Sequence, residues 1–269
     1  MTKLPPLGMG TWGMGGKFER DESNIKKSIA ILKYGLDSGI KLIDVAEIYG
    51  AGLTESIVGQ TIKEYLRSDI YLVSKVWKTN LRYNDVLRSC EQSLARLGTN
   101  YIDLYLIHWP NEEVPLQETM EAMEYLLQKG LVRNVGVSNF SVALMQQAQT
   151  FLPNHKLFAD QIEYNLSQRS AEQDIIPYCV KNRINIMAYR PLAKGKIPLL
   201  NNEIINNLAK KYNKTPVQIA LNWITSQNIT IIPKTSNIEH LKENIGILGW
   251  KLTENDIKTL GHFGKMKPP

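Results

Sequence analysis

Four side chains capable of acid–base chemistry follow short apolar segments at the start of this chain. They are Asp44 and Tyr49 after Leu42-Ile43, Lys75 after Ile70–Ser74, and His108 after Ile102–Ile107. The carboxyl ends of strands in a parallel barrel converge on one face, and active sites lie on that face. A carboxylate, a phenol, an amine and an imidazole would therefore meet there, which indicates an enzyme.

The chemistry suited to this set is protonation of a carbonyl oxygen while a hydride reaches the carbon. An unperturbed tyrosine has a pKa of about 10 and is a poor proton donor at neutral pH. A lysine ammonium about 4 Å away would stabilise the tyrosinate by about 4 kcal/mol at an effective dielectric near 20. We therefore expect Lys75 to lower the pKa of Tyr49 by up to about 3 units. Asp44 would hold Lys75 charged, and neutral His108 could donate a hydrogen bond to the carbonyl.

Each of these residues also has an ordinary structural interpretation. Asp44 alone fits a capping or turn carboxylate, and Tyr49 fits an aromatic residue on the rim. A lysine at a strand end, such as Lys75, is usually solvated, and His108 lies between apolar residues as a core histidine would. Four independent coincidences, in order on three successive strands, are less plausible than one site.

Apolar, β-branched runs alternate with amphipathic ones along the whole chain, which predicts repeated strand–helix units and a parallel sheet. The expected strands are Leu7–Thr11, Leu42–Val45, Ile70–Ser74, Ile102–Ile107, Asn134–Ser138, Phe158–Ile162, Asn185–Tyr189 and Ile229–Ile232. The expected helices are Asn24–Asp37, Thr54–Leu66, Asn84–Leu97, Pro115–Gln128, Ser141–Gln149, Ala171–Lys181, Asn202–Ser226 with a break near Pro216, and Ile238–Ile245. Eight such units favour a single (β/α)8 TIM barrel domain over residues 1–269, with an open doubly wound sheet as the alternative.

One motif points elsewhere. The segment Gly8–Gly13 matches the G-x-G-x-x-G dinucleotide fingerprint. That pattern has meaning only after a strand and at the start of a helix, and the following Met14-Gly15-Gly16 cannot open a helix. We interpret the segment as a first barrel strand with small residues where chains crowd together.

Composition excludes several classes of protein. The net charge of +6 comes without a Lys/Arg block, so we expect no nucleic-acid partner, although the excess could favour a small anionic ligand. Only Cys90 and Cys179 are present, too few for a disulfide framework, which predicts a reducing compartment. No apolar run is long enough for a membrane span, and the N-terminus lacks the long apolar stretch of a signal peptide. We expect a cytoplasmic monomer with no membrane association and no bound metal.

Four motifs resemble those of the aldo-keto reductases, and the resemblance extends from Leu7 to about Leu260. They are Leu42–Gly50 with Asp44 and Tyr49, Val73-Ser74-Lys75, Asp103–Pro110 with His108, and Ile231–Lys234. The family is a (β/α)8 barrel that reduces aldehydes and ketones with a nicotinamide dinucleotide, usually NADPH, without a Rossmann domain. The resemblance implies Tyr49 as general acid, Lys75 and Asp44 as the pair that tunes it, and His108 as the residue that orients the carbonyl.

The resemblance also implies a cofactor cleft. Ser138, Asn139 and Gln161 match the residues that hold the nicotinamide carboxamide, which needs both a donor and an acceptor, and Tyr189 matches the aromatic residue that stacks on the ring. Lys234, Thr235 and Ser236 match the loop that binds the adenosine 2′-phosphate. The remaining expected cofactor-binding residues are Gly10, Thr11, Arg190, Leu192, His240, Glu243 and Asn244.

Two positions depart from the family pattern. His240 stands where strong NADPH binders usually carry arginine, so we expect NADPH with a weaker preference and NADH as a second choice. Arg190 stands where many relatives have serine, and we hypothesise that it reaches the cofactor pyrophosphate and compensates for the charge lost at His240. The alternative is a surface arginine beside Pro191.

Aromatic residues are expected to line the substrate site. They are Trp12, Trp77 and Trp109, joined by Ile48, and such walls suit aldehydes and the apolar faces of sugars. The segment after Leu260 is short for the family, which predicts an open pocket. The expected substrates are small aldehydes, dicarbonyls or keto-sugars.

Three other functions stay open at this point. Lys75 could be a Schiff-base nucleophile in a barrel lyase. The chain could instead be a non-catalytic subunit that binds NADP and senses its redox state. A nucleic-acid binder is the third, although no basic stripe supports it.

Overall fold

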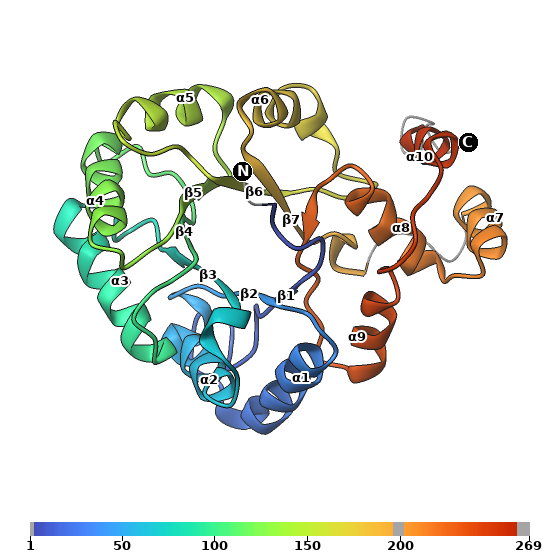
Figure 1. Cartoon of the computed structure of the whole chain (residues 1–269), viewed down its shortest axis with the longest axis horizontal. Coiled ribbons are helices and arrows are strands. Elements are labelled where there is room, and N and C mark those ends of the chain that lie inside the picture. The colour runs from blue at the N-terminus through green and yellow to red at the C-terminus, as the bar shows by residue number, and fades with distance from the viewer. Residues whose placement is uncertain (1–2, 196–201, 263–269) are drawn as a thin grey trace.

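The computed structural model describes residues 3–195 and 202–262. Eight parallel strands lie in sequence order β1 to β8 and form the barrel of Figure 1. The strands are β1 (Gly8–Gly10), β2 (Leu42–Asp44), β3 (Tyr71–Val76), β4 (Leu104–Ile107), β5 (Val135–Ser138), β6 (Ala159–Glu163), β7 (Asn185–Tyr189) and β8 (Thr230–Ile231). Parallel bridges of Leu7 with Ile231 and of Gly10 with Lys234 join the last strand to the first. The expected (β/α)8 barrel is confirmed.

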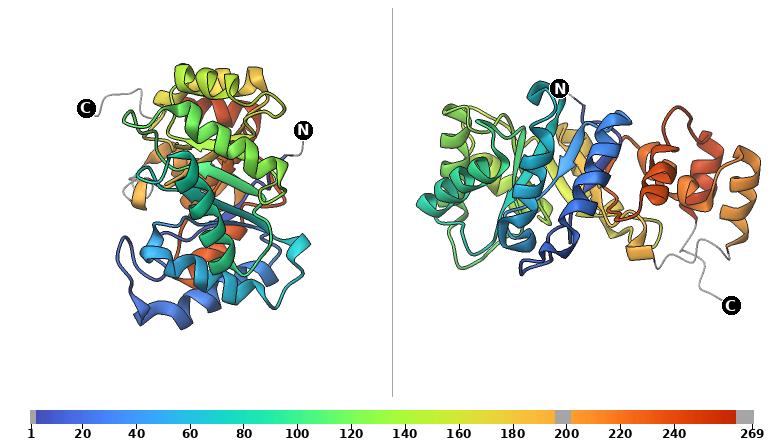
Figure 2. Two further views of the ribbon diagram at one scale, coloured as in Figure 1. Left: turned by 90° about the vertical axis from the view of Figure 1, so that its left-hand side faces the viewer. Right: turned by 90° about the horizontal axis from the view of Figure 1, so that it is seen from below.

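Helices surround the strands and cover the outer face of the barrel, as Figures 1 and 2 show. Within the described ranges they are α1 (Ile25–Asp37), α2 (Leu53–Ile62), α3 (Tyr83–Leu97), α4 (Leu116–Gln128), α5 (Val142–Thr150), α6 (Ile175–Asn182), α7 (Glu203–Tyr212), α8 (Pro216–Thr225), α9 (Ile238–Ile245) and α10 (Glu254–Gly261). Helices α7 and α10 lie beside each other outside the ring.

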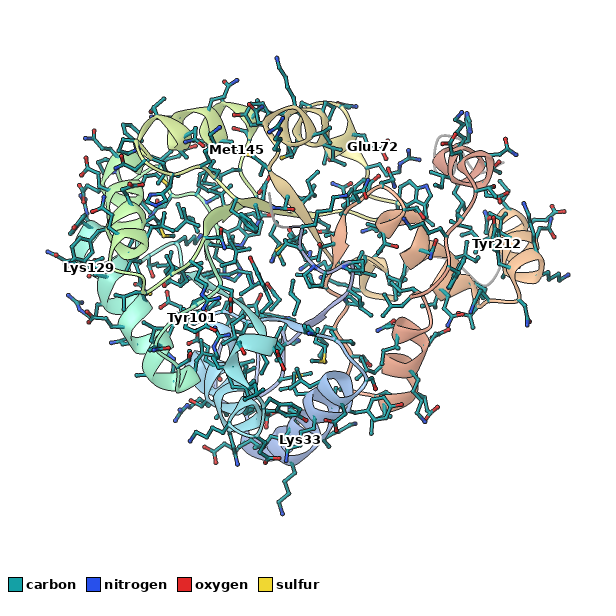
Figure 3. The ribbon with its side chains drawn as sticks, viewed as in Figure 1. Lys33, Tyr101, Lys129, Met145, Glu172 and Tyr212 are labelled. Carbon is teal, nitrogen blue, oxygen red and sulfur yellow. The ribbon has the colours of Figure 1, made fainter. Side chains whose placement is uncertain are left out.

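The core has two parts because successive residues of a strand face opposite sides. A small cluster fills the inside of the barrel and includes Leu42, Val73, Leu104 and Met187. A larger cluster lies between the strands and the helices. Side chains fill the centre of the barrel in Figure 3, while Lys33 points outward from the helical ring, so the barrel is a packed core and not a pore.

Small residues let the first strand pack inside the barrel. A Cβ on Gly8 would lie 2.3 Å from a methyl carbon of Leu42, and one on Gly10 would lie 2.7 Å from the Ile232 carbonyl oxygen. The glycine pattern of this segment therefore serves barrel closure, because β1 runs over Gly8–Gly10 and no helix follows it directly.

The helix boundaries differ from expectation in four places. Helix α6 begins at Ile175 and not at Ala171, because Ser170–Glu172 forms a separate 3-10 turn. Helix α2 ends at Ile62 and not at Leu66, because Leu66 adopts an extended conformation that leads into β3. The expected helix over 202–226 is two helices: Asn213 is left-handed, and Thr215 then begins α8 with a capping box in which Pro216 is the first helical residue. Helix α10 was not expected, although Thr253 caps its start.

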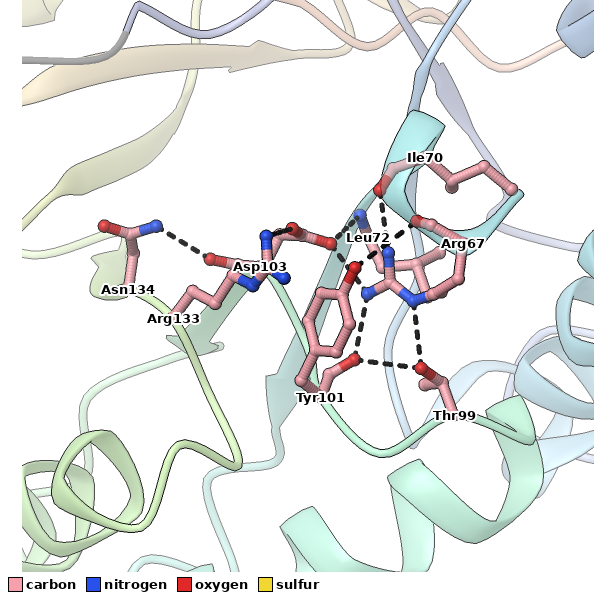
Figure 4. Close-up of polar contacts among 8 residues, drawn as sticks. All are labelled: Arg67, Ile70, Leu72, Thr99, Tyr101, Asp103, Arg133 and Asn134. Carbon is pink, nitrogen blue, oxygen red and sulfur yellow. Dashed lines mark hydrogen bonds and ion pairs between the residues drawn. The ribbon is translucent and has the colours of Figure 1, made fainter. Parts of the chain in front are cut away.

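The amino-terminal end of the barrel is held together by a partly buried ion pair (Figure 4). Arg67 Nη2 lies 2.7 Å from Asp103 Oδ2, and the same guanidinium donates to the carbonyl oxygens of Ile70 and Tyr101. The guanidinium carbons of Arg67 and Arg133 lie over the Tyr101 ring, at 3.9 and 3.8 Å from its centroid. This cluster joins the segments that lead into β3, β4 and β5.

Candidate active site

The structure brings Asp44, Tyr49, Lys75 and His108 together at the carboxyl ends of β2, β3 and β4. Lys75 Nζ lies 2.9 Å from Asp44 Oδ2, 2.9 Å from the Val45 carbonyl oxygen and 3.3 Å from the Tyr49 hydroxyl oxygen. The rings of Tyr49 and His108 meet edge to face with centroids 5.7 Å apart. All four side chains are buried.

Local structure explains how Tyr49 reaches its neighbours. A short 3-10 turn, Tyr49–Gly52, follows β2, and Gly50 and Ala51 have positive φ of 54° and 47°. A Cβ on Gly50 would lie 2.2 Å from the Gly15 carbonyl oxygen, so only glycine fits at that position. This turn carries the phenol back over the end of β2 toward Lys75.

Burial determines the acidity of the Tyr49 phenol. It raises the pKa of Tyr49 above its ordinary value, and the Lys75 ammonium opposes that rise without cancelling it. The expectation that Lys75 lowers the pKa of Tyr49 below its ordinary value is therefore wrong, because a buried phenolate loses more hydration than one ammonium returns. The phenol stays protonated at neutral pH and can donate its proton.

The partners of Tyr49 have fixed charges. Burial opposes the charge of Lys75, but the Asp44 carboxylate and the Tyr49 hydroxyl outweigh it and raise the pKa of the ammonium. Burial, followed by the charge of Lys75, lowers the pKa of His108 to about 2, so the imidazole is neutral. Its Nδ1 is buried and has no hydrogen-bond partner among residues 3–195 and 202–262. A charged Lys75 fits a positioning role and not a Schiff-base nucleophile, which must be a neutral amine.

A continuous network of amides and hydroxyls lies beside this cluster. Gln161 Nε2 donates to Asp44 Oδ1 at 2.7 Å, and the Ser138 hydroxyl donates to the Gln161 carbonyl at 2.7 Å. Asn139 Nδ2 donates to Ser138 Oγ and to the His108 carbonyl, while Asn139 Oδ1 accepts from the Tyr189 hydroxyl at 2.8 Å. These residues therefore lie together, as the sequence indicated, and their side chains fix one another.

Aromatic rings also contact the Tyr49 and His108 side chains of this cluster. Trp12 meets Tyr49 edge to face at 4.8 Å between centroids, and Trp77 meets His108 in the same way at 5.1 Å. Ile48 is half-buried beside Tyr49, whereas Trp109 is 41% exposed. No ring contact of Trp109 occurs within residues 3–195 and 202–262.

The segment after β8 carries the expected phosphate-binding residues. Lys234 is exposed and has no ion-pair partner in the described part of the chain. Its pKa is lowered, first by partial loss of water around the ammonium and then by the charge of Lys27 on α1. Thr235 bonds to Asn237, which caps α9, and Ser236 is exposed beside it. An unpaired ammonium near the start of a helix suits an anion.

The other expected cofactor residues lie on α9, at the end of β1 and after β7. His240 is exposed on α9, Glu243 is half-buried and Asn244 is buried. Gly10 and Thr11 belong to the first strand end, where the Thr11 hydroxyl donates to the Asp44 carbonyl at 2.7 Å. Leu192 is half-buried after β7.

Arg190 has a partner that the sequence did not reveal. Its Nη1 lies 2.9 Å from Glu163 Oε2, and its carbonyl accepts from Asn165 Nδ2. Its φ of 50° is left-handed, which a non-glycine residue adopts only when the surroundings hold it. The guanidinium is close enough to Tyr49 to lower the pKa of the phenol slightly. Arg190 is therefore a residue of the barrel mouth.

Three further residues of this region were missed in the sequence. Phe18 contacts Trp12, Glu47 accepts from the backbone N–H of Trp77 at 2.6 Å, and Lys27 lies near Lys234. Phe18 gave a weak signal, as a large aromatic residue in a glycine-rich loop after the first strand. Neither Glu47 nor Lys27 differs in sequence context from ordinary surface residues.

Within the described ranges, no group of three or more His, Cys, Asp or Glu side chains is placed to hold a metal ion. None of the helices there is long and apolar enough to span a bilayer. Cys90 and Cys179 are free and buried.

Comparison with known proteins gives consistent results. The family model described as aldo/keto reductase family matches residues 6–264. The methylglyoxal reductase YeaE of Escherichia coli is 37% identical, over 96% of this chain and 90% of that protein. The thermostable aldo-keto reductase Tm1743, solved with the inhibitor epalrestat, superposes with a TM-score of 0.93 at 41% identity, covering 97% of this chain and 96% of that one. An aldo/keto reductase from Klebsiella pneumoniae, solved with NADP and acetate, gives a TM-score of 0.87 at 35% identity, covering 99% and 93%.

Proposed function

The chain belongs to the aldo-keto reductase family and is a carbonyl reductase, and from this premise we propose that it reduces small aldehydes, dicarbonyls or keto-sugars to alcohols with NADPH. The relative from Escherichia coli is named for the reduction of methylglyoxal, which is a dicarbonyl, and this supports the substrate class. The observation that carries the proposal is the buried phenol of Tyr49 at 3.3 Å from the Lys75 ammonium.

Each residue of the cluster has a role in this proposal. Tyr49 donates its proton to the carbonyl oxygen, because its raised pKa keeps the phenol protonated. The Lys75 ammonium stabilises the negative charge that develops on the Tyr49 oxygen as the proton leaves. Asp44 keeps Lys75 charged and oriented. His108 is neutral and can donate a hydrogen bond to the same carbonyl oxygen without introducing a second charge.

The polar groups around the barrel mouth suit a nicotinamide cofactor, which when bound supplies the hydride. Ser138, Asn139 and Gln161 present the amide and hydroxyl groups that would fix a carboxamide, and Tyr189 would cover one face of the ring. In the segment after β8, the Ser236 hydroxyl and the Lys234 ammonium would bind a phosphate. Lys234 has no ion-pair partner in the described part of the chain. The preference for NADPH over NADH rests on Lys234, since the exposed His240 lacks the two-pronged donor geometry of arginine.

We also propose that the enzyme works as a single-domain monomer in the cytoplasm. The two free buried cysteines suit a reducing compartment. The catalytic cluster is formed within one chain, so the reaction needs no second copy.

The proposal is tested by following the absorbance of the reduced cofactor with the purified protein. The panel would contain methylglyoxal, simple aldehydes and keto-sugars, each measured with NADPH and again with NADH. We expect turnover of methylglyoxal and simple aldehydes, faster with NADPH. Turnover of no carbonyl compound by protein that binds NADPH would contradict the proposal and favour a cofactor-sensing role.

A further inference from the structure

Five aromatic side chains form a closed circuit at the barrel mouth. One of them, Phe18, was not among the residues that the sequence predicted for this site. Trp12 contacts Tyr49 at 4.8 Å and Phe18 at 5.2 Å between centroids. Phe18 lies 6.3 Å from Trp77, which contacts His108 at 5.1 Å. Tyr49 and His108 close the circuit. These separations are all within the range of favourable ring pairs.

Phe18 differs from the other members of the circuit in its exposure. It is 56% exposed, although Tyr49 and His108 are buried and the two tryptophans are half-buried. A single exposed apolar side chain needs no explanation on its own. Here the exposed ring contacts both tryptophans beside the proposed proton donor, so a substrate bound there would meet it.

The loop that carries Phe18 is tied to the catalytic turn by backbone hydrogen bonds. The Gly50 N–H donates to the Lys17 carbonyl at 2.7 Å, so the residue before Phe18 is bound to the residue after Tyr49. Asn24 accepts from the Gly15 N–H at 3.0 Å and so fixes the other end of the loop. A Cβ on Gly16 would lie 1.9 Å from the Glu19 carbonyl oxygen, so the tight turn before Phe18 requires glycine. The backbone that carries the ring is therefore fixed relative to the catalytic turn.

We propose that Phe18 is a specificity-determining residue: with Trp12 and Trp77 it forms an aromatic slot that selects substrates with an aromatic ring next to the carbonyl. The inference rests on the proposed reductase function. The substrate carbonyl must reach Tyr49 and His108, which each contact one of the tryptophans, so the rest of the substrate lies against the slot. A flat aromatic ring makes edge-to-face or offset-stacked contacts with such rings, whereas a puckered saturated ring of the same size packs against them without the ring-pair contribution.

The test compares benzaldehyde with cyclohexanecarboxaldehyde, which has the same carbon framework without the flat ring, and uses methylglyoxal as a small reference. Because one ring pair contributes about 0.5–1.5 kcal/mol, kcat/KM of Phe18→Leu for benzaldehyde should fall about 2- to 13-fold. For cyclohexanecarboxaldehyde and methylglyoxal it should stay within about twofold. Phe18→Tyr, which keeps the ring, should restore benzaldehyde reduction.

Two controls make the result decisive. Tyr125→Leu removes an exposed aromatic residue from α4 on the outer helical ring and should change none of the three rates. The dissociation constant for NADPH and the midpoint of thermal unfolding should be unchanged in Phe18→Leu. Equal losses for both ring-bearing aldehydes, or no loss for benzaldehyde, would overturn the inference while methylglyoxal turnover still upheld the proposed function. Absence of all turnover in the unmodified protein would instead reject the function itself.

Discussion

The ammonium of Lys75 lies 3.3 Å from the phenolic oxygen of Tyr49 in a site where neither side chain is more than 7% exposed. Two effects of burial oppose each other there. Loss of hydration makes the phenolate costly, while the same low polarity strengthens its attraction to the ammonium. The first effect is larger, and the pKa of the phenol is raised. Tyr49 is thus a protonated donor whose developing charge meets a cation already in place.

The first prediction concerns Tyr49→Phe. Carbonyl reduction should fall by about 10²- to 10⁴-fold in kcat, the usual contribution of a general acid, because phenylalanine has no proton to donate. The dissociation constant for NADPH, measured by fluorescence titration, should change less than about twofold. Tyr83→Phe on the outer helix α3 serves as control. A Tyr49→Phe variant that keeps more than about a tenth of kcat would show that another group donates the proton.

The second prediction separates stability from activity in the buried ion pair. Lys75→Met leaves the Asp44 carboxylate buried without its cation and should lower the free energy of unfolding by about 3–5 kcal/mol. The double variant Asp44→Asn/Lys75→Met removes both charges and should recover most of that loss. Urea denaturation measures both.

Neither variant should reduce carbonyls at more than a small fraction of the original rate, because the phenolate then forms without a cation. Full activity in the stable double variant would mean that the pair is structural only. Equal instability of the single and double variants would mean that charge burial is not the cause.

The third prediction concerns pH. Tyr49 acts in its protonated form, so the rate of reduction should fall only as pH rises through the raised pKa of the phenol, above about 10. His108 is neutral down to a pKa of about 2, so kcat should show no inflection near its ordinary value of 6.5. An inflection there would show that His108 titrates in the working enzyme.

The same histidine should make folding sensitive to acid. Its folded-state pKa lies below its unfolded value of 6.5, so below pH 6.5 the unfolded chain binds the extra proton and stability falls. From pH 6.5 to 5 this group should remove about 2 kcal/mol. The loss should disappear in His108→Gln and persist in His262→Gln, whose side chain is exposed.

The sequence predicted the parts of this enzyme that depend on local pattern and order. Asp44, Lys75 and His108 could be placed together because they follow apolar strand segments, and parallel strand ends meet at one face. The balance of charges at Tyr49 could not be predicted, because it depends on how completely the phenol is buried. Phe18 was missed for a similar reason: its contact with Trp12 depends on the path of a glycine-rich loop, which hydrophobic periodicity does not describe. The residues after His262, on which the expected openness of the pocket depends, lie outside the described residues.

The fourth prediction tests whether Arg190 binds the cofactor. Its guanidinium is held 2.9 Å from Glu163 and is 45% exposed at the barrel mouth, where an anionic pyrophosphate could share it. In Arg190→Ala the KM for NADPH and for NADH should both rise by about 10- to 150-fold, since a hydrogen bond to a charged group contributes about 1.5–3 kcal/mol. Glu163→Gln, which frees the guanidinium, should lower both values or leave them unchanged. Unchanged KM values in Arg190→Ala would assign the residue to its ion pair alone.

The fifth prediction concerns the opposite end of the barrel, where stability and activity should separate. The Arg67 guanidinium is the shared partner of Asp103, Ile70, Thr99 and Tyr101, and its side chain is 20% exposed. Arg67→Met would remove the closest cation of the buried Asp103 carboxylate and leave Arg133 at 3.7 Å, so the free energy of unfolding should fall by about 1.5–3 kcal/mol. Arg82→Met, which breaks an exposed pair with Glu118, should cost only about 0–1 kcal/mol.

Because the amino-terminal face of a barrel supports the fold while the chemistry occurs on the other face, kcat/KM for methylglyoxal should be unchanged in both variants below their unfolding temperatures. A tenfold fall in kcat/KM of folded Arg67→Met would show instead that this cluster positions β3 and β4, and with them Lys75 and His108.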